Sequence, residues 1–137
     1  MNEPYTGHCL CGKIQFQAQG DPLWVSYCHC DSCRHATGSA VAVYVGFSED
    51  RVIFDGNTPK KFTSSPAVIR GFCPDCGSPI FYQSERWPGE IHLFIGIIDQ
   101  AAQLPPQIHV YTKEQMPWLH IEDPLPRHKT VPSEGGS

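Results

Sequence analysis

The chain has 137 residues, of which 40% are hydrophobic and 18% are charged, and its formal net charge is −4. This length suits a single domain, and the apolar share excludes a disordered, highly charged chain. The ten lysine and arginine residues are scattered along the sequence. Because nucleic acids and anionic membrane surfaces bind clustered positive charge, we expect neither as a partner.

The start of the chain, residues 1–4, has neither the basic nor the apolar region of a secretory signal, and no apolar run approaches the roughly 20 residues that a membrane-spanning helix needs. We therefore expect a cytoplasmic protein. Seven cysteines, an odd number, fit a disulfide framework poorly in that reducing compartment. They fall into three tight groups, so metal ligation explains them better than dispersal as buried apolar side chains does.

Short strands are the elements that the sequence predicts, because thirteen prolines and twelve glycines interrupt every helical period. Residues 13–19 alternate Ile14, Phe16 and Ala18 with three glutamines, which is typical of a half-exposed strand. Further segments rich in β-branched and aromatic residues predict strands over 23–27, 40–47, 51–54, 67–72, 79–83, 91–98 and 108–111. We therefore expect an all-β fold.

The remaining segments predict little regular structure. One short helix is expected after Asp31, whose side chain would cap the first amides of that helix. Residues 55–57, Asp-Gly-Asn, predict a hairpin turn, because Gly and Asn tolerate a positive φ. No periodicity follows residue 121, so we expect a domain over residues 1–121 and a loosely packed tail over residues 122–137.

Two cysteine motifs, one near the start of the chain and one near its middle, together supply four thiols. A set of four thiolates is typical of a closed structural zinc site. In the first motif, alternation along an extended chain would point both sulfurs to one side and Leu10 toward the core. In the second motif, Gly77 suits the tight turn that brings two sulfurs to one ion. We predict a structural zinc site formed by Cys9, Cys11, Cys73 and Cys76.

The main alternative for the second motif is a redox pair of the thioredoxin kind. That motif expects a helix directly after it, whereas Pro79 and a β-rich run follow here. We therefore favour the shared zinc site over a redox pair.

A third group, Cys28, Cys30 and Cys33, offers only three thiols. Alternation places His29 on the side opposite the first two sulfurs, so it is a poor candidate for the same ligand sphere. Three interpretations stay open: a zinc site with a vacant position for water or substrate, a closed site completed by a distant histidine, or no metal at all. The candidates for such a histidine are His8, His35, His92 and His109.

These motifs resemble those of the glutathione-dependent formaldehyde-activating enzyme family, which shares its domain with the centromere protein V group. The resembling segments are 7–14, 28–34 with 37–38, 72–77, and 105–110 leading to 117–118. The resemblance rests on the order and spacing of all seven cysteines. It implies an Mss4-like fold of antiparallel sheets with two zinc ions, the structural one and a second one near the chemistry at Cys28, Cys30 and Cys33.

The resemblance also implies carbon–sulfur lyase activity, in which glutathione and formaldehyde combine to S-(hydroxymethyl)glutathione. A thiol held on zinc would be kept as its thiolate while a small aldehyde approaches. Three thiolates already give the zinc site a net negative charge, so positioning of the nucleophile is favoured over polarisation of the carbonyl. The expected partners are therefore a small-molecule thiol such as glutathione and a small aldehyde.

Several residues keep two interpretations each. Lys13, Arg34 and His35 either pair with carboxylates of the thiol or are solvated surface charges. His109 and Trp118 either line the site or close the sheet as a last strand with an aromatic anchor. A non-enzymatic zinc module that binds a protein partner is the rival function, and the acidic balance argues against a nucleic-acid-binding zinc ribbon.

Overall fold

The computed structural model describes residues 3–132, and within them ten strands and one α-helix form the fold. The predicted all-β class is confirmed. The elements are β1 (Tyr5–His8), β2 (Ile14–Ala18), β3 (Trp24–Cys28), α1 (Asp31–Thr37), β4 (Ala42–Ser48), β5 (Val52–Gly56), β6 (Lys60–Ser65), β7 (Val68–Phe72), β8 (Pro79–Ser84), β9 (Glu90–Phe94) and β10 (Ile108–Val110). Short 3-10 turns connect some of them. No helix in the described part of the chain is long and apolar enough to cross a membrane.

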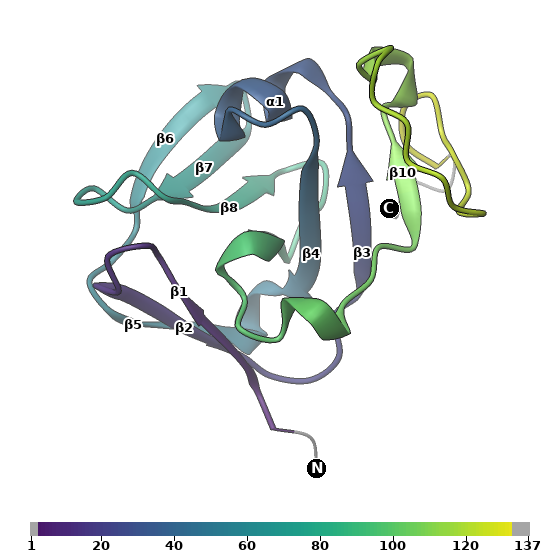
Figure 1. The fold of residues 1–137 in the computed structure, drawn as a ribbon. Coiled ribbons are helices and arrows are strands. Elements are labelled where there is room, and N and C mark those ends of the chain that lie inside the picture. Colours follow the sequence, from purple (N-terminus) through teal and green to yellow (C-terminus); the bar gives the residue numbers. More distant parts are fainter. Residues whose placement is uncertain (1–2, 133–137) are drawn as a thin grey trace.

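The strands form two sheets. The smaller one has the order β1-β2-β5, and the larger one has the order β10-β3-β4-β9-β8-β7-β6. Neighbouring strands are antiparallel except for β10, which runs parallel to β3. The larger sheet is therefore antiparallel, as expected, except at its β10 edge. Figure 1 shows β10 flanking β3 at one edge of the molecule and β6 at the opposite side.

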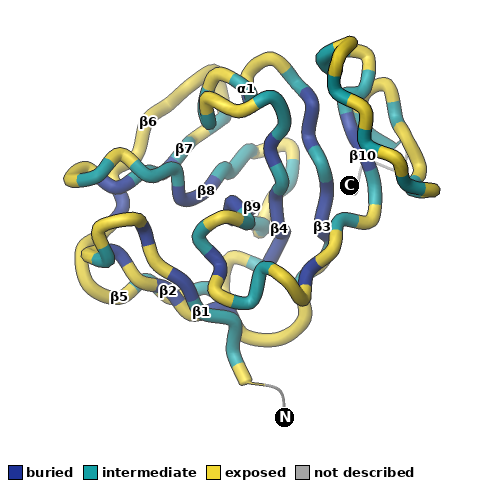
Figure 2. Tube along the Cα trace, in the orientation of Figure 1, coloured by how far each residue is buried: buried dark blue, intermediate teal, exposed yellow. Residues whose placement is uncertain are grey.

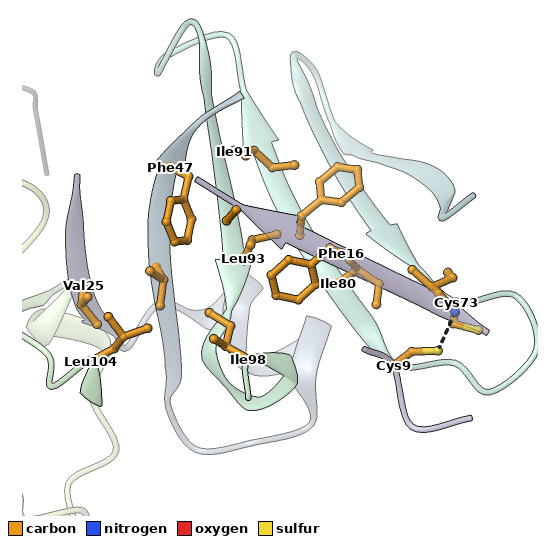
Figure 3. Packing of buried hydrophobic residues seen from close by; sticks show 14 residues of the cluster. Cys9, Phe16, Val25, Phe47, Cys73, Ile80, Ile91, Leu93, Ile98 and Leu104 are labelled. Carbon is orange, nitrogen blue, oxygen red and sulfur yellow. Dashed lines mark hydrogen bonds between the residues drawn. The ribbon is translucent and has the colours of Figure 1, made fainter. Parts of the chain in front are cut away.

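The core lies between the two sheets. In β2, the predicted alternation is confirmed: Ile14, Phe16 and Ala18 are buried and the intervening glutamines are exposed. They meet alternate residues of the larger sheet, among them Val45 and Leu93 (Figure 3). Full burial of one large apolar side chain contributes about 1.5–3 kcal/mol, so this interface holds the sheets together.

The other face of the larger sheet carries a second, smaller cluster. Because side chains alternate along a strand, Val25 points into the core while Trp24 and Cys28 point to this second face. On β4, Tyr44 and Ala42 do the same. The second face therefore gathers Cys28, the last residue of β3, together with large aromatic side chains.

Some predicted boundaries are wrong. The strand expected over 91–98 ends at Phe94, and a 3-10 turn follows over Ile95–Ile97. Strands β1 and β6 were not predicted. Every residue of β6 is exposed, so it lacks the apolar alternation that marks a strand (Figure 2). In β1, Gly7 lies so close to the backbone of Ile97 that no side chain would fit. This explains why a glycine, which usually argues against a strand, occupies this position.

The turn expected at residues 55–57 is not a hairpin. Gly56 does take a positive φ of 77°, as predicted. However, β5 pairs with β2 and the next strand, β6, pairs with β7, so the chain crosses there from one sheet to the other. The close approach of Gly56 to the carbonyl of Lys13 and the bond from the Asn57 amide to that same oxygen, 2.8 Å, fix the crossing.

The segment after residue 121 packs more closely than the sequence predicted. The amide of His109 donates to Pro126 O at 2.9 Å, the amide of His128 donates to His109 O at 2.9 Å, and the amide of Tyr111 donates to Thr130 O at 2.8 Å. The segment therefore follows β10. The domain boundary at residue 121 stays a prediction, and residues 133–137 of the expected tail lie outside the described residues.

Candidate metal centres

The first cysteine cluster brings together thiols from two distant parts of the chain. The Sγ atoms of Cys9, Cys11, Cys73 and Cys76 all lie within 4.8 Å of one another. Cys9 Sγ is 3.6 Å from Cys11 Sγ, which is 3.8 Å from Cys73 Sγ. Four sulfurs that each lie about 2.3 Å from a zinc ion at tetrahedral angles are roughly 3.8 Å apart. The donor set and its spacing therefore fit a structural zinc ion.

Two similar turns present these thiols. After Cys9, the amide of Gly12 donates to Cys9 O at 3.0 Å, and after Cys73 the amide of Gly77 donates to Cys73 O at 2.8 Å. Both glycines have a positive φ, 80° and 78°. The first motif is thus a turn and not the extended segment that alternation implied. As a result Leu10, expected in the core, is 85% exposed.

Hydrogen bonds favour the thiolate form at two cysteines of this cluster. Burial raises the pKa of Cys9, but the Ile14 amide, which donates to its sulfur at 3.4 Å, and the thiols of Cys11 and Cys73 lower it by more. At Cys11 the backbone of Lys13 lowers the pKa, but burial and the neighbouring thiols raise it to about 12. A hydrogen bond from Ser78 lowers the pKa of Cys76 to about 5. Deprotonated sulfur is the form that binds metal, so the lowered pKa values of Cys9 and Cys76 support ligation.

The second cluster lies where β3 leads into α1. The Sγ atom of Cys28 lies 3.5 Å from that of Cys30 and 3.3 Å from that of Cys33, and the last two are 2.9 Å apart. Cys30 is the N-cap of α1, because its sulfur accepts from the Cys33 amide at 3.3 Å. The expected cap, Asp31, is instead the first residue of the helix and accepts from Arg34 Nη2 at 3.1 Å.

Two residues from other strands complete the surroundings of this trio. The hydroxyl of Tyr44 donates to Cys33 Sγ at 3.2 Å, and Nη1 of Arg70 donates to that hydroxyl at 3.2 Å. Hydrogen bonds from Cys28 and Cys30 lower the pKa of Cys33 to about 3, and the Tyr44 hydroxyl and the charge of Arg70 act in the same direction. Hydrogen bonds with Cys30 and Cys33, together with burial, raise the pKa of Cys28. The negative charge of the trio is therefore favoured at Cys33.

No histidine joins the trio. Within the described residues, the candidate ligand groups contain only cysteines. His8 contacts Cys9 O, His35 contacts Asp31, His92 contacts Glu90, and His109 contacts His29 and Asp123. His29 points away from the thiols, as alternation predicted. The trio therefore offers three protein ligands and no fourth among residues 3–132.

A groove begins at the trio and runs across the second face of the larger sheet. Its volume is about 790 Å³, and its walls come from β3, α1, β4, the β6–β7 hairpin, β8, β9 and the end of β10. Of Lys13, Arg34 and His35, only His35 lines the groove. Lys13 instead pairs with Asp75 at 3.8 Å, and Arg34 pairs with Asp31. Trp118 is 66% exposed and lies outside it.

Two residues that support the trio were not predicted from the sequence. Tyr44 and Arg70 lie on predicted strands, but no motif marks them. Alternation along β4 places Tyr44 on the same face as Ala42, and only the pairing of the strands shows that this face holds Cys28. His109 is fully buried on the opposite face of the sheet, where it stacks on Tyr27.

Comparison with known proteins supports one relationship. Residues 4–114 match the family described as glutathione-dependent formaldehyde-activating enzyme. An uncharacterized lyase of Schizosaccharomyces pombe is 28% identical over 78 residues, which are 57% of this chain and 56% of that protein. The chain thus spans about half the length of that relative. The crystal structure of a Rhodobacter sphaeroides protein has a similar fold, with a TM-score of 0.59 and 19% identity over 69% of this chain and 87% of that chain.

Proposed function

The chain belongs to the glutathione-dependent formaldehyde-activating enzyme family, and on that premise we propose that it is a zinc-dependent carbon–sulfur lyase. It would join a small-molecule thiol, such as glutathione, to a small aldehyde such as formaldehyde, or cleave the resulting S-hydroxymethyl adduct. The observation that carries this proposal is the cysteine trio at one end of the groove, with three thiols and no fourth protein ligand among the described residues. Clustered free thiols also fit a cytoplasmic location.

Two zinc ions are part of the proposal. Cys9, Cys11, Cys73 and Cys76 would hold a structural ion that ties β1 and β2 to the turn after β7. Cys28, Cys30 and Cys33 would hold the second ion, whose remaining position could take the substrate thiol and keep it as a thiolate. The three protein thiolates make the trio negative, which favours positioning of the nucleophile over activation of the aldehyde.

The addition itself is a simple exchange of bonds. The thiol sulfur forms a bond to the carbonyl carbon, the π electrons of the C=O bond move to oxygen, and the proton lost by the thiol ends on that oxygen. No oxidant or reductant is needed. The groove brings the two reactants together beside Cys33, which converts a bimolecular encounter into one of fixed geometry.

Tyr44 and Arg70 assist from the floor of the groove. The tyrosine hydroxyl donates to Cys33 Sγ, and Arg70 donates to the tyrosine, so negative charge at the trio is stabilised from one side. This arrangement fixes the direction of the Cys33 side chain.

The direct test is the rate at which glutathione and formaldehyde combine with and without the protein, followed by the same assay on Cys30→Ser. We expect acceleration by the protein and its loss in the variant, whose melting temperature and first zinc ion should persist. A rate equal to the spontaneous reaction, in protein that carries two zinc ions, would rule out this activity and leave a non-enzymatic zinc module. Full activity of Cys30→Ser would exclude the trio as the site.

A further inference from the structure

The size of the groove exceeds what its proposed smallest substrate needs. A water molecule takes up about 30 Å³ in the liquid, and formaldehyde has only two heavy atoms. The groove measures about 790 Å³, which is within the range of roughly 300–1,000 Å³ seen for sites that take drug-sized ligands. The groove therefore accommodates ligands much larger than a one-carbon aldehyde, and the thiol of the proposed reaction would share that space.

Aromatic side chains make up much of the wall. Six of them line the groove from six different strands and loops: Trp24, Phe62, Phe72, Tyr82, Trp87 and Tyr111. Phe62 is 58% exposed although it is a large apolar residue, so its ring is available to a ligand. Aromatic faces and edges pack best against flat or conjugated groups. The wall thus favours a ligand with an aromatic body.

Two arginines bring positive charge to the same wall. The guanidinium of Arg70 lies 5.1 Å from the ring centroid of Tyr82, and that of Arg86 lies 5.0 Å from the ring centroid of Trp87. Among residues 3–132, neither arginine forms an ion pair with a carboxylate. Arg70 donates to the hydroxyls of Tyr44 and Ser64, which are neutral partners.

Few carboxylates line the groove. Glu114 is the one carboxylate among the lining residues, and it already accepts from the Asp31 amide at 2.8 Å. Two arginines therefore face one carboxylate along the wall, beside aromatic surface, while the thiols of the trio lie at one end of the groove. A planar guanidinium presents several N–H donors in a geometry that suits a carboxylate, so the ligand that completes this wall carries one.

We propose that the aldehyde taken by the groove bears an aromatic ring and a carboxylate, which would lie against the aromatic wall and the two arginines. This inference rests on the proposed addition of a thiol to an aldehyde at the trio. The reaction is unchanged: the C–S bond forms at the aldehyde carbon attached to the ring, and the thiol proton ends on the former carbonyl oxygen.

Binding can be tested without turnover, because Trp24 and Trp87 lie in the wall. In a Trp118→Phe background, which removes the exposed tryptophan outside the groove, fluorescence quenching would be measured with 4-carboxybenzaldehyde, benzaldehyde and cyclohexanecarboxylate. Titration of free tryptophan with each compound corrects for absorption. We expect 4-carboxybenzaldehyde to bind about tenfold more tightly than either of the others, since each lacks one of the two features.

Matched variants locate the site. Phe62→Ser and Arg86→Gln should each weaken binding of 4-carboxybenzaldehyde by about three- to tenfold. Ile53→Ser, at a residue on β5 with 60% exposure, and Arg51→Gln are the controls outside the groove and should change it less than about twofold. Equal binding of the three probes, or equal effects of variants and controls, would overturn the inference.

The outcome for the lyase activity is separable from this one. Rapid turnover of formaldehyde with glutathione, together with no binding of 4-carboxybenzaldehyde, would overturn the inference and leave the proposed function standing. Tight binding of that probe with no turnover of any aldehyde would overturn the proposed function. Turnover of 4-carboxybenzaldehyde with a lower KM than formaldehyde would support both.

Discussion

The imidazole rings of His29 and His109 lie stacked in the interior, with His29 Nε2 2.9 Å from His109 Nδ1. His109 Nε2 in turn lies 2.9 Å from an Asp123 oxygen. His29 is flanked by two cysteines of the trio, and Asp123 belongs to the segment after residue 121. The pair therefore links the turn that carries the thiols to the C-terminal segment, on the face of the sheet opposite the groove.

Loss of this pair should reduce stability. In His109→Leu, Nε2 of His29 would stay buried without a partner, and Nδ1 of His29 already has none. An unsatisfied buried polar group costs about 1–3 kcal/mol, so we expect the free energy of unfolding to fall by that amount in urea denaturation. The exposed His120→Leu should change it by less than about 0.5 kcal/mol. Equal stability of the two variants would contradict a role for the pair.

The first cysteine cluster should be essential for folding. Cys73 is fully buried and shares its site with thiols from the start of the chain. Because a structural zinc contributes about 10 kcal/mol, which is comparable to the whole stability of a domain, Cys73→Ser should give a protein without a cooperative thermal transition. Circular dichroism would follow this. A Cys73→Ser protein that melts like the wild type would show that the cluster holds no structural metal.

The two metal sites should differ in how fast they lose zinc. We expect reduced protein to contain two zinc ions per chain. A chelator should remove one of them quickly and the other much more slowly. The reason is that the trio supplies three ligands and opens onto the groove, whereas the first cluster supplies four. Chelator titration with a colour-forming reagent measures both phases. Release in one phase, or a single ion in the intact protein, would contradict the assignment.

Tyr44 should affect catalysis more than metal content. Tyr44→Phe removes the donor to Cys33 Sγ and leaves Arg70 without that acceptor. We expect kcat for glutathione and formaldehyde to fall by about tenfold, as for other residues that hydrogen-bond a metal ligand, while two zinc ions stay bound. Tyr5→Phe, at a tyrosine packed on the core between the sheets, is the matched control. An unchanged kcat in Tyr44→Phe would remove this residue from the mechanism.

Acid should destabilise the protein partly through His92. Burial lowers the pKa of His92 below its usual value of about 6.5, and Glu90 opposes this only in part. The unfolded chain therefore binds a proton at His92 at a higher pH than the folded chain does. Stability is fully present above pH 6.5 or so, and it falls as the pH drops below that value toward the lower folded pKa.

The comparison of wild type with His92→Gln isolates this contribution. Acid also competes with metal for the thiols, but it does so equally in both proteins. Urea unfolding at about pH 7.5 and about pH 5.5 should show a smaller loss of stability in the variant than in the wild type. The same loss in both would mean that His92 titrates normally in the folded state.

Alternation of apolar and polar residues in the sequence predicted those strands that bury one face. The alternation of Ile14, Phe16 and Ala18 reports one buried face, so β2 could be found from sequence. The exposed strand β6 has no such face, and its place depends on pairing with β7. Turn chemistry at Gly56 was predictable, but the partner of the strand before it was not, because pairing depends on the whole sheet.

The candidate site shows the same division. Spacing alone grouped the seven cysteines as the structure does. Spacing did not identify Tyr44, which lies 11 positions from Cys33, or Arg70, which lies 26 positions from Tyr44. Their contacts follow from strand register. The histidine pair was also missed, since a buried His29 was recognisable only as a side chain pointing away from the thiols.

The long span between the halves of the first cluster bears on how the protein is made. Cys11 and Cys73 are 62 positions apart, whereas the members of the trio lie within five. At about 5–20 residues per second, a ribosome needs several seconds to synthesise that stretch. During this interval Cys9 and Cys11 are on a nascent chain without their partners. Oxidants should therefore lower the yield of newly made protein more than they harm protein that has already matured.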